Sequence, residues 1–397
     1  MTKTKRKTKV LKRLLIIVIV IILCLGVRFI YSYFHGKHTT VDMSKKNPDN
    51  TVLACAVFDG TELWEDAVVT IEEGVIGRDS TFSHDEVNHE YFLMPGLVDA
   101  HLHITTRNQM EQMVLNGVTT ACDVAASQEL EHSYEALNVW SARSSIMMTV
   151  EDVNDYVETT IAQGGTYIKV VADLPQILGG GIMEQSVLEE LVSCAHENQL
   201  KVAVHAISVA GIQLAVDSGV DLLIHIPIGE TLPQELAEQI AAQEIAVMPT
   251  MAMMQAFANS PIYGYQKTDY DDAVAAVLLL HSLDVPILVA TDSSDSIFVP
   301  RLKHGTTLHK EMQLLVDAGL TPLEVLRGAT TKTADAFGIE DIGTITPGEY
   351  ATMVLVQGRP DQEITDSSNI VQIWVNGKAV LDDSAYSLQM GEIQAAE

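Results

Sequence analysis

Eight short apolar segments alternate with amphipathic or polar segments through the middle of the chain, and this alternation restricts the fold more than any other feature. Residues 185–198 and 271–283 are two of the intervening segments with helical periodicity. Strands that alternate with helices pair in parallel, and eight repeats predict a closed (β/α)8 TIM barrel. An open doubly wound sheet is the alternative, but no glycine-rich phosphate-binding motif follows any of the strands. The eight expected strands are 97–103, 118–124, 144–148, 167–172, 201–206, 221–226, 246–250 and 286–292.

Strand patterns also flank the alternating region at both of its ends. They cover 52–58, 66–71 and 91–93 before it, and 353–356, 370–375 and 378–381 after it. Asn376-Gly377 is a typical two-residue hairpin turn between the last two. We therefore predict a small β-sandwich domain built from residues 51–94 and 344–385, next to a barrel of residues 95–343.

The N-terminal sequence has the pattern of a membrane anchor. Seven basic residues within residues 1–13 precede an apolar stretch, 14–34, that only Arg28 interrupts. About 20 apolar residues span a bilayer, and the basic end stays in the cytoplasm. No small-residue cleavage site follows, so we predict an uncleaved single-pass transmembrane helix rather than a signal peptide that is removed. Residues 35–50 would be a tether, with the globular part on the extracytoplasmic side of the cell membrane.

The rest of the chain is strongly acidic. Nine of the 24 Lys and Arg residues lie within residues 1–40, which contain no Asp or Glu, so residues 41–397 hold 15 basic and 53 acidic residues, a net charge of −38. This charge argues against nucleic acid and against anionic membrane surfaces as partners of the globular part. Its cysteines, Cys55, Cys122 and Cys194, are irregularly spaced in apolar segments and imply no disulfide framework.

Polar side chains stand near the carboxyl ends of five of the eight expected strands. His101 and His103 lie one residue apart, so they point to the same side of the first strand, as does Asp99. The other polar positions on these strands are Lys169, His205, His225 and Asp292. Each alone has an ordinary explanation, such as a hydrogen-bonded strand-end histidine or a helix cap. Together they predict a metal site, because burying unpaired polar groups in a barrel costs several kcal/mol.

These segments resemble the amidohydrolase superfamily, in the branch of imidazolonepropionase-like proteins and metal-dependent prolidases. The resemblance covers about residues 51–382. Ala351-Thr-Met-Val departs from the Ala-Asp-Leu-Val more usual there, and the segment between the third and fourth strands is short, so substrate specificity cannot be transferred. The matching motifs are Pro95-Gly-Leu-Val-Asp-Ala-His-Leu-His103, Tyr167-Ile-Lys169, Val204-His205, His225-Ile-Pro227, Pro249-Thr250, Thr291-Asp292, and the tail from Ala318-Gly-Leu-Thr-Pro322 through Ala329-Thr330 to Gly343-Thr-Ile-Thr-Pro-Gly348.

The resemblance implies a ligand set for two divalent metal ions, with zinc expected and manganese or iron as alternatives. Lys169 would bridge the two ions as a carboxylated lysine, since an ammonium would repel them. Asp99 would either orient a ligand or form a structural hydrogen bond. The implied ligands are His101, His103 and Asp292 for one ion and His205 and His225 for the other.

The resemblance also implies the chemistry. A metal-bridged hydroxide would attack an amide, a cyclic amide or a dipeptide bond, and Asp292 would be the catalytic residue that moves the proton to the leaving nitrogen. A lactonase or a deaminase on the same centre, a mononuclear site with unmodified Lys169, and a catalytically decayed surface binding protein remain as alternatives. The partner is a small-molecule substrate, and neither its identity nor the oligomeric state follows from the sequence.

Substrate-binding residues are left unassigned. Charged or aromatic side chains lie in or near the loops after the first, seventh and eighth strands, and any of them could contact a carboxylate: Arg107, Tyr263, Arg301 and Lys303. His304, in the loop after the eighth strand, could also reach the site.

Overall fold

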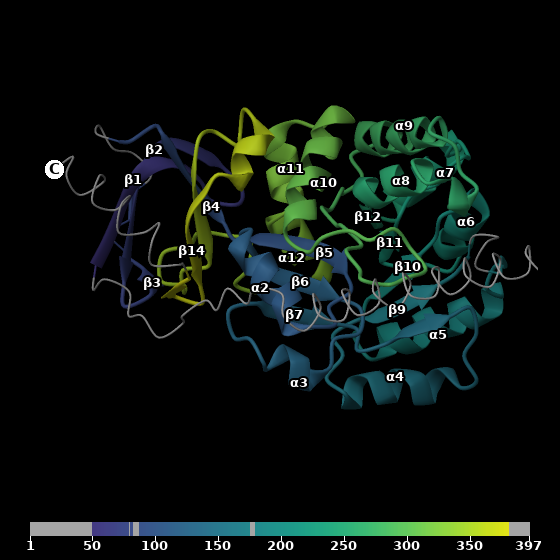
Figure 1. Ribbon diagram of the computed structural model, residues 1–397. Coiled ribbons are helices and arrows are strands. Elements are labelled where there is room, and N and C mark those ends of the chain that lie inside the picture. Colours follow the sequence, from purple (N-terminus) through teal and green to yellow (C-terminus); the bar gives the residue numbers. More distant parts are fainter. Residues whose placement is uncertain (1–49, 79, 82–86, 175–178, 381–397) are drawn as a thin grey trace, which may run out of the picture. The chain divides into compact units, whose positions relative to one another are not determined.

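The computed structural model describes residues 50–78, 80–81, 87–174 and 179–380, which all belong to the compact unit Val41–Glu397 (Figure 1). The predicted basic segment 1–13 and the predicted membrane segment 14–34 lie outside the described residues, as does the tether up to residue 49. Within the described ranges, no helix combines the length and the apolar character that crossing a bilayer requires.

Parallel strands form two sheets in the centre of this unit, so the fold is α/β. The first sheet has three strands in the order β5, β6, β7, and the second has five in the order β12, β11, β10, β9, β8. Their bounds are β5 Leu97–Leu102, β6 Val118–Asp123, β7 Asn138–Ser141, β8 Ser145–Met147, β9 Ile168–Val171, β10 Val202–His205, β11 Leu222–Ile224 and β12 Ala246–Met248.

The predicted eighth strand, 286–292, is not a regular strand. It joins the two sheets through parallel bridges between Val247 and Ile287 and between Leu102 and Ser293. In addition, the Ala100 amide donates to the Val289 carbonyl. Asp292, at the end of the segment, adopts a left-handed backbone conformation (φ 53°), so the chain leaves the extended conformation there. The segment nevertheless connects β12 to β5.

The third strand is split into two pieces, of which the sequence analysis predicted only the second. β7 pairs with β6, whereas β8 pairs with β9. Arg143 stands between the pieces with φ 64°, which turns the chain out of the extended conformation. The Thr166 amide, just before β9, donates to the Ser141 carbonyl and joins the two sheets on this side. Hydrogen bonds and bridges thus connect eight positions in a ring.

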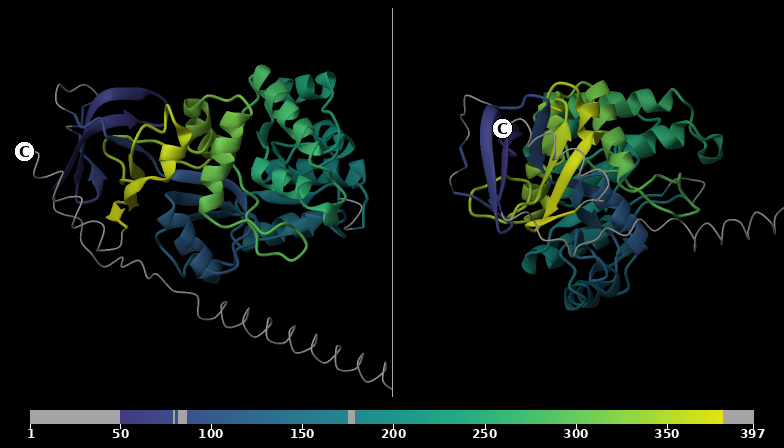
Figure 2. Two further views of the ribbon diagram at one scale, coloured as in Figure 1. Left: turned by 45° about the horizontal axis from the view of Figure 1, so that its top comes forward. Right: turned by 60° about the vertical axis from the view of Figure 1, so that its left-hand side comes forward.

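Helices follow the strands and lie on the outside of the ring (Figures 1 and 2). Several begin at a polar cap, such as Thr106 before α2 and Ser208 before α6, whose side chains accept backbone N–H groups of the first turn. The helices are α2 Arg107–Leu115, α3 Gln128–Glu131, α4 Val153–Ala162, α5 Gln185–Glu197, α6 Val209–Asp217, α7 Gln234–Ala242, α8 Met251–Ala258, α9 Asp269–Ser282, α10 Thr306–Asp317, α11 Pro322–Gly328 and α12 Thr331–Phe337, with short 3-10 helices η2 Pro261–Tyr263 and η3 Ile364–Ser368.

The core divides according to the alternation of side chains along the strands. One set, including Ala203, Ala246 and Leu288, packs within the ring. The neighbouring residues, such as Val204 and Val247, belong to the cluster that contains the apolar faces of the helices. The strands are therefore buried on both faces, as expected for parallel strands covered by helices.

Strands from both chain ends form one seven-stranded sheet, in the order β15, β14, β13, β4, β1, β2, β3. The two ends lie side by side in Figures 1 and 2, purple for the early strands and yellow for the late ones. The sheet curls so that its two edges approach each other through Ala351. The Ala351 amide donates to the Gly74 carbonyl, between β2 and β3, and the Gly377 amide, between β14 and β15, donates to the Ala351 carbonyl. The predicted sandwich is thus a single curled sheet around one apolar cluster. Its strands are β1 Asn50–Phe58, β2 Leu63–Glu72, β3 Val75–Ile76, β4 Tyr91–Pro95, β13 Met353–Gln357, β14 Ile370–Val375 and β15 Lys378–Ala379.

Candidate metal site

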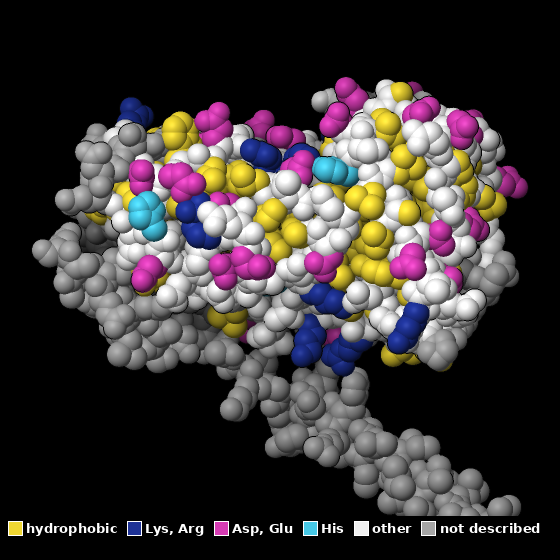
Figure 3. Space-filling view, turned by 90° about the horizontal axis from the view of Figure 1, so that it is seen from above, with side chains coloured by type: hydrophobic (Ala, Val, Ile, Leu, Met, Phe, Trp, Pro, Cys, Tyr) yellow, Lys and Arg dark blue, Asp and Glu magenta, His cyan; other side chains and the backbone are white. Residues whose placement is uncertain are grey.

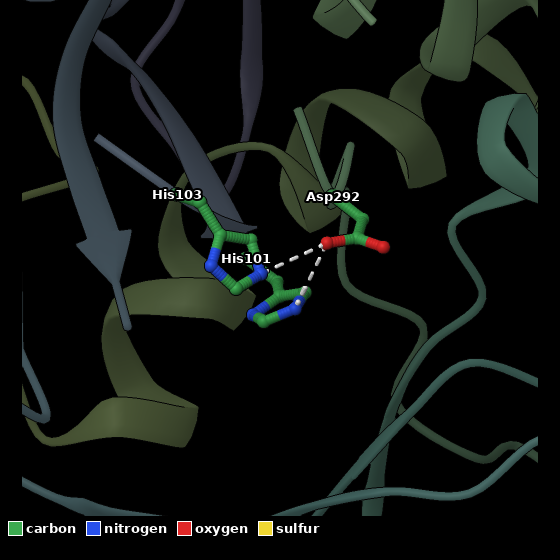
Figure 4. Close-up of side chains that lie close together, drawn as sticks. All are labelled: His101, His103 and Asp292. Atoms are coloured by element: carbon green, nitrogen blue, oxygen red, sulfur yellow. Dashed lines mark ion pairs between the residues drawn. The ribbon is translucent and has the colours of Figure 1, made fainter. Parts of the chain in front are cut away.

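Two histidines at the end of β5 and one aspartate of the segment that follows β12 converge at the carboxyl ends of the strands (Figure 4). The Nε2 atoms of His101 and His103 lie 3.4 and 3.2 Å from Oδ1 of Asp292. One ligand atom from each residue falls within 4.8 Å of the other two. His101 is buried, but the side chain of His103 is 37% exposed, so the cluster is open to solvent on the His103 side.

Asp99 holds the backbone that carries these residues. Its Oδ1 accepts from the Thr291 amide (3.0 Å) and the His101 amide (3.3 Å), and its Oδ2 accepts from the Thr291 hydroxyl (2.7 Å). The Asp292 amide donates in turn to the His101 carbonyl (2.8 Å). Asp99 thus ties β5 to the residue before Asp292. It acts on the main chain, rather than on an imidazole ring.

The other three predicted ligands lie around the same point. Nζ of Lys169, on β9, is 3.4 Å from Nε2 of His101. The rings of His205, at the end of β10, and His225, just after β11, stand 4.4 Å apart edge to face. Nε2 of His225 is 3.9 Å from Oδ2 of Asp292. All six predicted ligand positions are therefore close together, and their roles as ligands stay predictions.

The residues present fit a divalent metal. Nδ1 of His101 and Nε2 of His205 are buried and have no hydrogen-bond partner. Buried polar atoms usually have a partner, so Nε2 of His205 is a candidate ligand atom, whereas Nδ1 of His101 lies across the ring from the Nε2 atom that faces Asp292. Imidazole and carboxylate are donors that zinc, manganese and iron accept.

Burial and the neighbouring charges keep the imidazoles neutral. Desolvation and the charge of Lys169 lower the pKa of both His101 and His205 to about 3. Desolvation and His205 lower the pKa of His225 well below its usual value. Neutral rings keep a lone pair free at neutral pH, which a metal ligand requires.

The same environment favours an ionised Asp292 and lowers the pKa of Lys169. Burial alone would raise the pKa of Asp292, but hydrogen bonds from His101 and His103 outweigh it and hold the pKa well below the usual value. Burial lowers the pKa of Lys169 to about 7, and the opposing effect of Asp292 is smaller. A substantial fraction of neutral amine therefore exists at neutral pH.

Comparison with known proteins settles the family. The sequence model of the amidohydrolase family matches residues 92–380, which is most of the chain. This chain belongs to the amidohydrolase family. The predicted resemblance is therefore confirmed.

Individual relatives of this amidohydrolase are distant. An adenine deaminase of Oceanobacillus iheyensis is 24% identical over 383 residues, which covers 87% of this chain but only 60% of that relative. A Xaa-Pro dipeptidase structure with bound methionine has a TM-score of 0.69 at 19% identity, covering 83% of this chain and 99% of that one. A prolidase structure from Bifidobacterium longum has a TM-score of 0.68 at 19% identity, covering 87% and 99%. At these identities the solved structures show a shared fold.

Two carboxylates that the sequence analysis did not identify shape the loops around the amidohydrolase site. Asp123, at the end of β6, accepts from the amides of Ile104, Ala125 and Ala126. Asp173, two residues after β9, accepts from the Ser208 amide (2.9 Å) and hydroxyl and from the neighbouring Ile207 amide. Aspartates directly after an apolar strand were the available signal, but from sequence alone they cannot be told from exposed loop residues.

Most of the loop residues left open by the sequence analysis have partners within the chain. Arg107 pairs with Glu111 and Arg301 with Asp295, and Tyr263 packs against the ring of Phe257. His304 contacts the His103 carbonyl through Nε2 (3.0 Å), so it contacts the backbone of the site. Lys303 lines a cavity of about 260 Å³ together with Arg301 and His304.

A larger cavity of about 480 Å³ lies over the carboxyl ends of β9, β10 and β11, the strands that carry or precede Lys169, His205 and His225. No Lys or Arg is found among the described residues that line it. Its acidic residues are already engaged with backbone, as Glu230 accepts from the Val209 amide and Asp269 from the Gln266 amide.

Proposed function

We propose that this amidohydrolase is a metal-dependent hydrolase that cleaves a carbon–nitrogen bond of a small molecule, in an amide, a cyclic amide or a dipeptide. The observation that carries the proposal is the cluster of His101, His103 and Asp292 at the carboxyl ends of the strands. A divalent metal, when bound there, polarises a carbonyl and lowers the pKa of a water molecule.

Asp292 is the proposed catalytic residue. Its Oδ1 faces His101 and His103, whereas Oδ2 faces His225 at 3.9 Å. The site environment keeps its carboxylate ionised, so it can accept a proton from the attacking water and pass it to the leaving nitrogen. The exposed edge at His103 is the side from which a substrate can approach.

We further propose that two zinc ions bind and that Lys169 is carboxylated. Lys169 is 2% exposed, and among the described residues no carboxylate lies within ion-pair distance of its amine. An unpaired buried ammonium is costly, whereas a carbamate supplies two anionic oxygens beside His101. A mass increase of one CO₂ on Lys169 in intact protein, lost in Lys169→Ala, would support this assignment.

Deamination is the second candidate, favoured by the similarity to a protein named adenine deaminase. Both reactions begin with attack by water on a carbon atom bonded to nitrogen and differ only in the leaving group, so the same residues can catalyse either one. The product distinguishes them: a deaminase releases ammonia, whereas an amide hydrolase releases a carboxylate and an amine.

The test is a substrate panel with the purified full-length chain. Dipeptides, lactams and aminopurines are offered, and amine and ammonia release are measured separately alongside the metal content. His101→Asn should lose both activity and metal, whereas His196→Asn should retain both, because His196 contacts Asp221 through Nε2 at 2.9 Å on the outside of the ring. Bound metal without any turnover across the panel would contradict the hydrolase proposal.

We also propose the chain organisation that the sequence predicts: a cytoplasmic segment 1–13, a transmembrane anchor 14–34, a tether 35–50, a β-domain of residues 51–94 and 344–385, and an extracytoplasmic (β/α)8 barrel of residues 95–343. The support for the anchor is the apolar stretch behind seven basic residues. The full chain should remain in membranes at alkaline pH and be cleaved by external protease in intact cells. Release of the full chain by alkaline wash would contradict the anchor.

A further inference from the structure

The first turn of α8 is capped by a side chain from another helix. Thr250 occupies the N-cap position, where a threonine hydroxyl usually accepts a backbone N–H of the first turn, but here it makes no such bond. Glu311 of α10 takes that place: its Oε1 accepts from the Met251 amide (2.7 Å) and its Oε2 from the Ala252 amide (2.6 Å). Glu311 is fully buried.

The hydroxyl of Thr250 is directed to the metal site instead. It lies 2.6 Å from Nδ1 of His225 and donates to the Pro249 carbonyl at 2.7 Å. A hydroxyl has a single proton, so once that proton is given to Pro249 the oxygen accepts from Nδ1–H of His225. The free lone pair of His225 is then on Nε2, the atom that faces Asp292.

Thr250 needs external support to hold this position. Its backbone is left-handed (φ 51°), which is unfavourable for a β-branched residue. The two amides bound by Glu311 belong to the next two residues, so α10 fixes the chain where it leaves the strained position. Glu311, rather than Thr250, therefore caps α8. The threonine hydroxyl is left to form its hydrogen bond with His225.

We propose that Thr250 and Glu311 are positioning residues that fix the tautomer and the ring orientation of His225 for metal binding. This inference rests on the proposed function for its metal-binding part, whereas the tautomer is a property of the protein alone. Groups of this kind around metal-binding histidines affect metal affinity by about 10–100-fold.

The first test measures the tautomer in protein without metal. Histidine nitrogen NMR at neutral pH should show His225 protonated at Nδ1 only, the signal being assigned by its loss in His225→Asn. Thr250→Ser should keep this tautomer, and Thr250→Val should produce a mixture or the Nε2–H form. A wild-type His225 protonated at Nε2, or an unchanged spectrum in Thr250→Val, would overturn the inference.

The second test measures zinc affinity by chelator competition. Thr250→Val should weaken the affinity for the more weakly bound zinc ion by about 10–100-fold. In Thr250→Ser this affinity should stay within about 3-fold of that of wild type. The affinity of Glu311→Met, in which both carboxylate acceptors are removed, should lie between those of the two Thr250 variants. Thr333→Val is the matched control, because the Thr333 hydroxyl is also buried and donates to a backbone carbonyl, that of Gly328 in α11.

These measurements separate the two proposals. If zinc binds and Thr250→Val weakens it while no substrate is turned over, the positioning role stands and the hydrolase proposal fails. If the affinity of Thr250→Val equals that of wild type, or falls only as much as that of Thr333→Val, the positioning role fails whatever the activity.

Discussion

At the scale of single residues, the site consists of buried polar side chains. Hydrogen bonds within the chain do not fully offset the free energy that their desolvation costs. His101, Lys169 and His225 are each at most 2% exposed. Buried polar groups are normally fully hydrogen-bonded, yet imidazole atoms of His101 and His205 have no partner. A cation bound by Nε2 of His205 would give that atom a partner, which links its burial to the proposed function.

Asp292→Asn should nearly abolish hydrolysis. The amide has the shape of the carboxylate but cannot accept the proton of the attacking water, so kcat should fall by about 10²–10⁴-fold. Steady-state kinetics at saturating metal measures this. Asp295→Asn is the matched control, since Asp295 pairs with Arg301 in the adjacent loop. Comparable kcat losses in both variants would contradict the role given to Asp292.

Glu311 should make stability depend on pH. Burial raises its pKa to about 8, against the lowering effect of the two amides that it binds. Between its ordinary pKa of 4.5 and about 8, the folded state keeps a proton that the unfolded state has lost. The contribution of Glu311 to stability is therefore greatest below the lower value and decreases as pH rises through the upper one.

Denaturant unfolding at pH 5, 6.5 and 8 measures this dependence. The free energy of unfolding of wild type minus that of Glu311→Gln should decrease as pH rises, because glutamine does not titrate and the buried histidines contribute equally in both proteins. An equal slope in the two proteins would assign the pH dependence to other groups.

At the scale of elements, carboxyl groups from neighbouring elements hold the starts of two helices. Asp173, after β9, accepts from the residues that open α6, and Glu311 of α10 accepts from the first turn of α8. Carboxyl groups are favourable at helix N-termini, where backbone N–H groups lack partners. The contact of Asp173 fixes the loop after β10, which carries His205, and that of Glu311 fixes the turn after β12.

Gly211→Ala in α6 should be destabilising, contrary to the usual gain of about 0.5–1 kcal/mol for this change inside a helix. A Cβ at Gly211 would overlap the carboxylate of Asp173. We expect a loss of about 1–3 kcal/mol, as for other overpacked sites. In a thermal or denaturant double-mutant cycle, the loss should shrink when Asp173→Ala is also present. Additive losses would show that the overlap is not the cause.

The sequence pattern located the strands better than it described their continuity. Apolar content identified both 144–148 and 286–292 as strands. It could not show that left-handed backbone conformations occur at Arg143, between the two pieces of the third position, and at Asp292, at the end of the eighth. The contacts around such residues come from distant parts of the sequence, as when Asp99 accepts from the amide of Thr291, the residue before Asp292.

At the scale of the whole molecule, strands from residues 50–95 and 353–379 pair in one sheet. On the face seen in Figure 3, Asp and Glu side chains are scattered between apolar and neutral ones. A dispersed negative charge of this kind is typical of a solvated surface. It is not the dense patch that would recruit a strongly basic partner.

Metal should stabilise the folded chain. A ligand that binds only the native state adds about 4 kcal/mol at a thousand times its dissociation constant. The melting temperature should therefore fall with a chelator and recover with zinc, and His101→Asn should respond to neither. A chelator response that persists in His101→Asn would place the metal elsewhere.

The sequence by itself determined the alternation, the family and the six polar positions, because periodicity and short motifs are local properties. Only the tertiary structure decided that Asp123, Asp173 and Glu311 hold backbone amides of other elements, and that Thr250 contacts His225. These residues lie 19 to 60 positions from their partners in the sequence. Contacts over such separations depend on how the ring closes, and no local pattern records that.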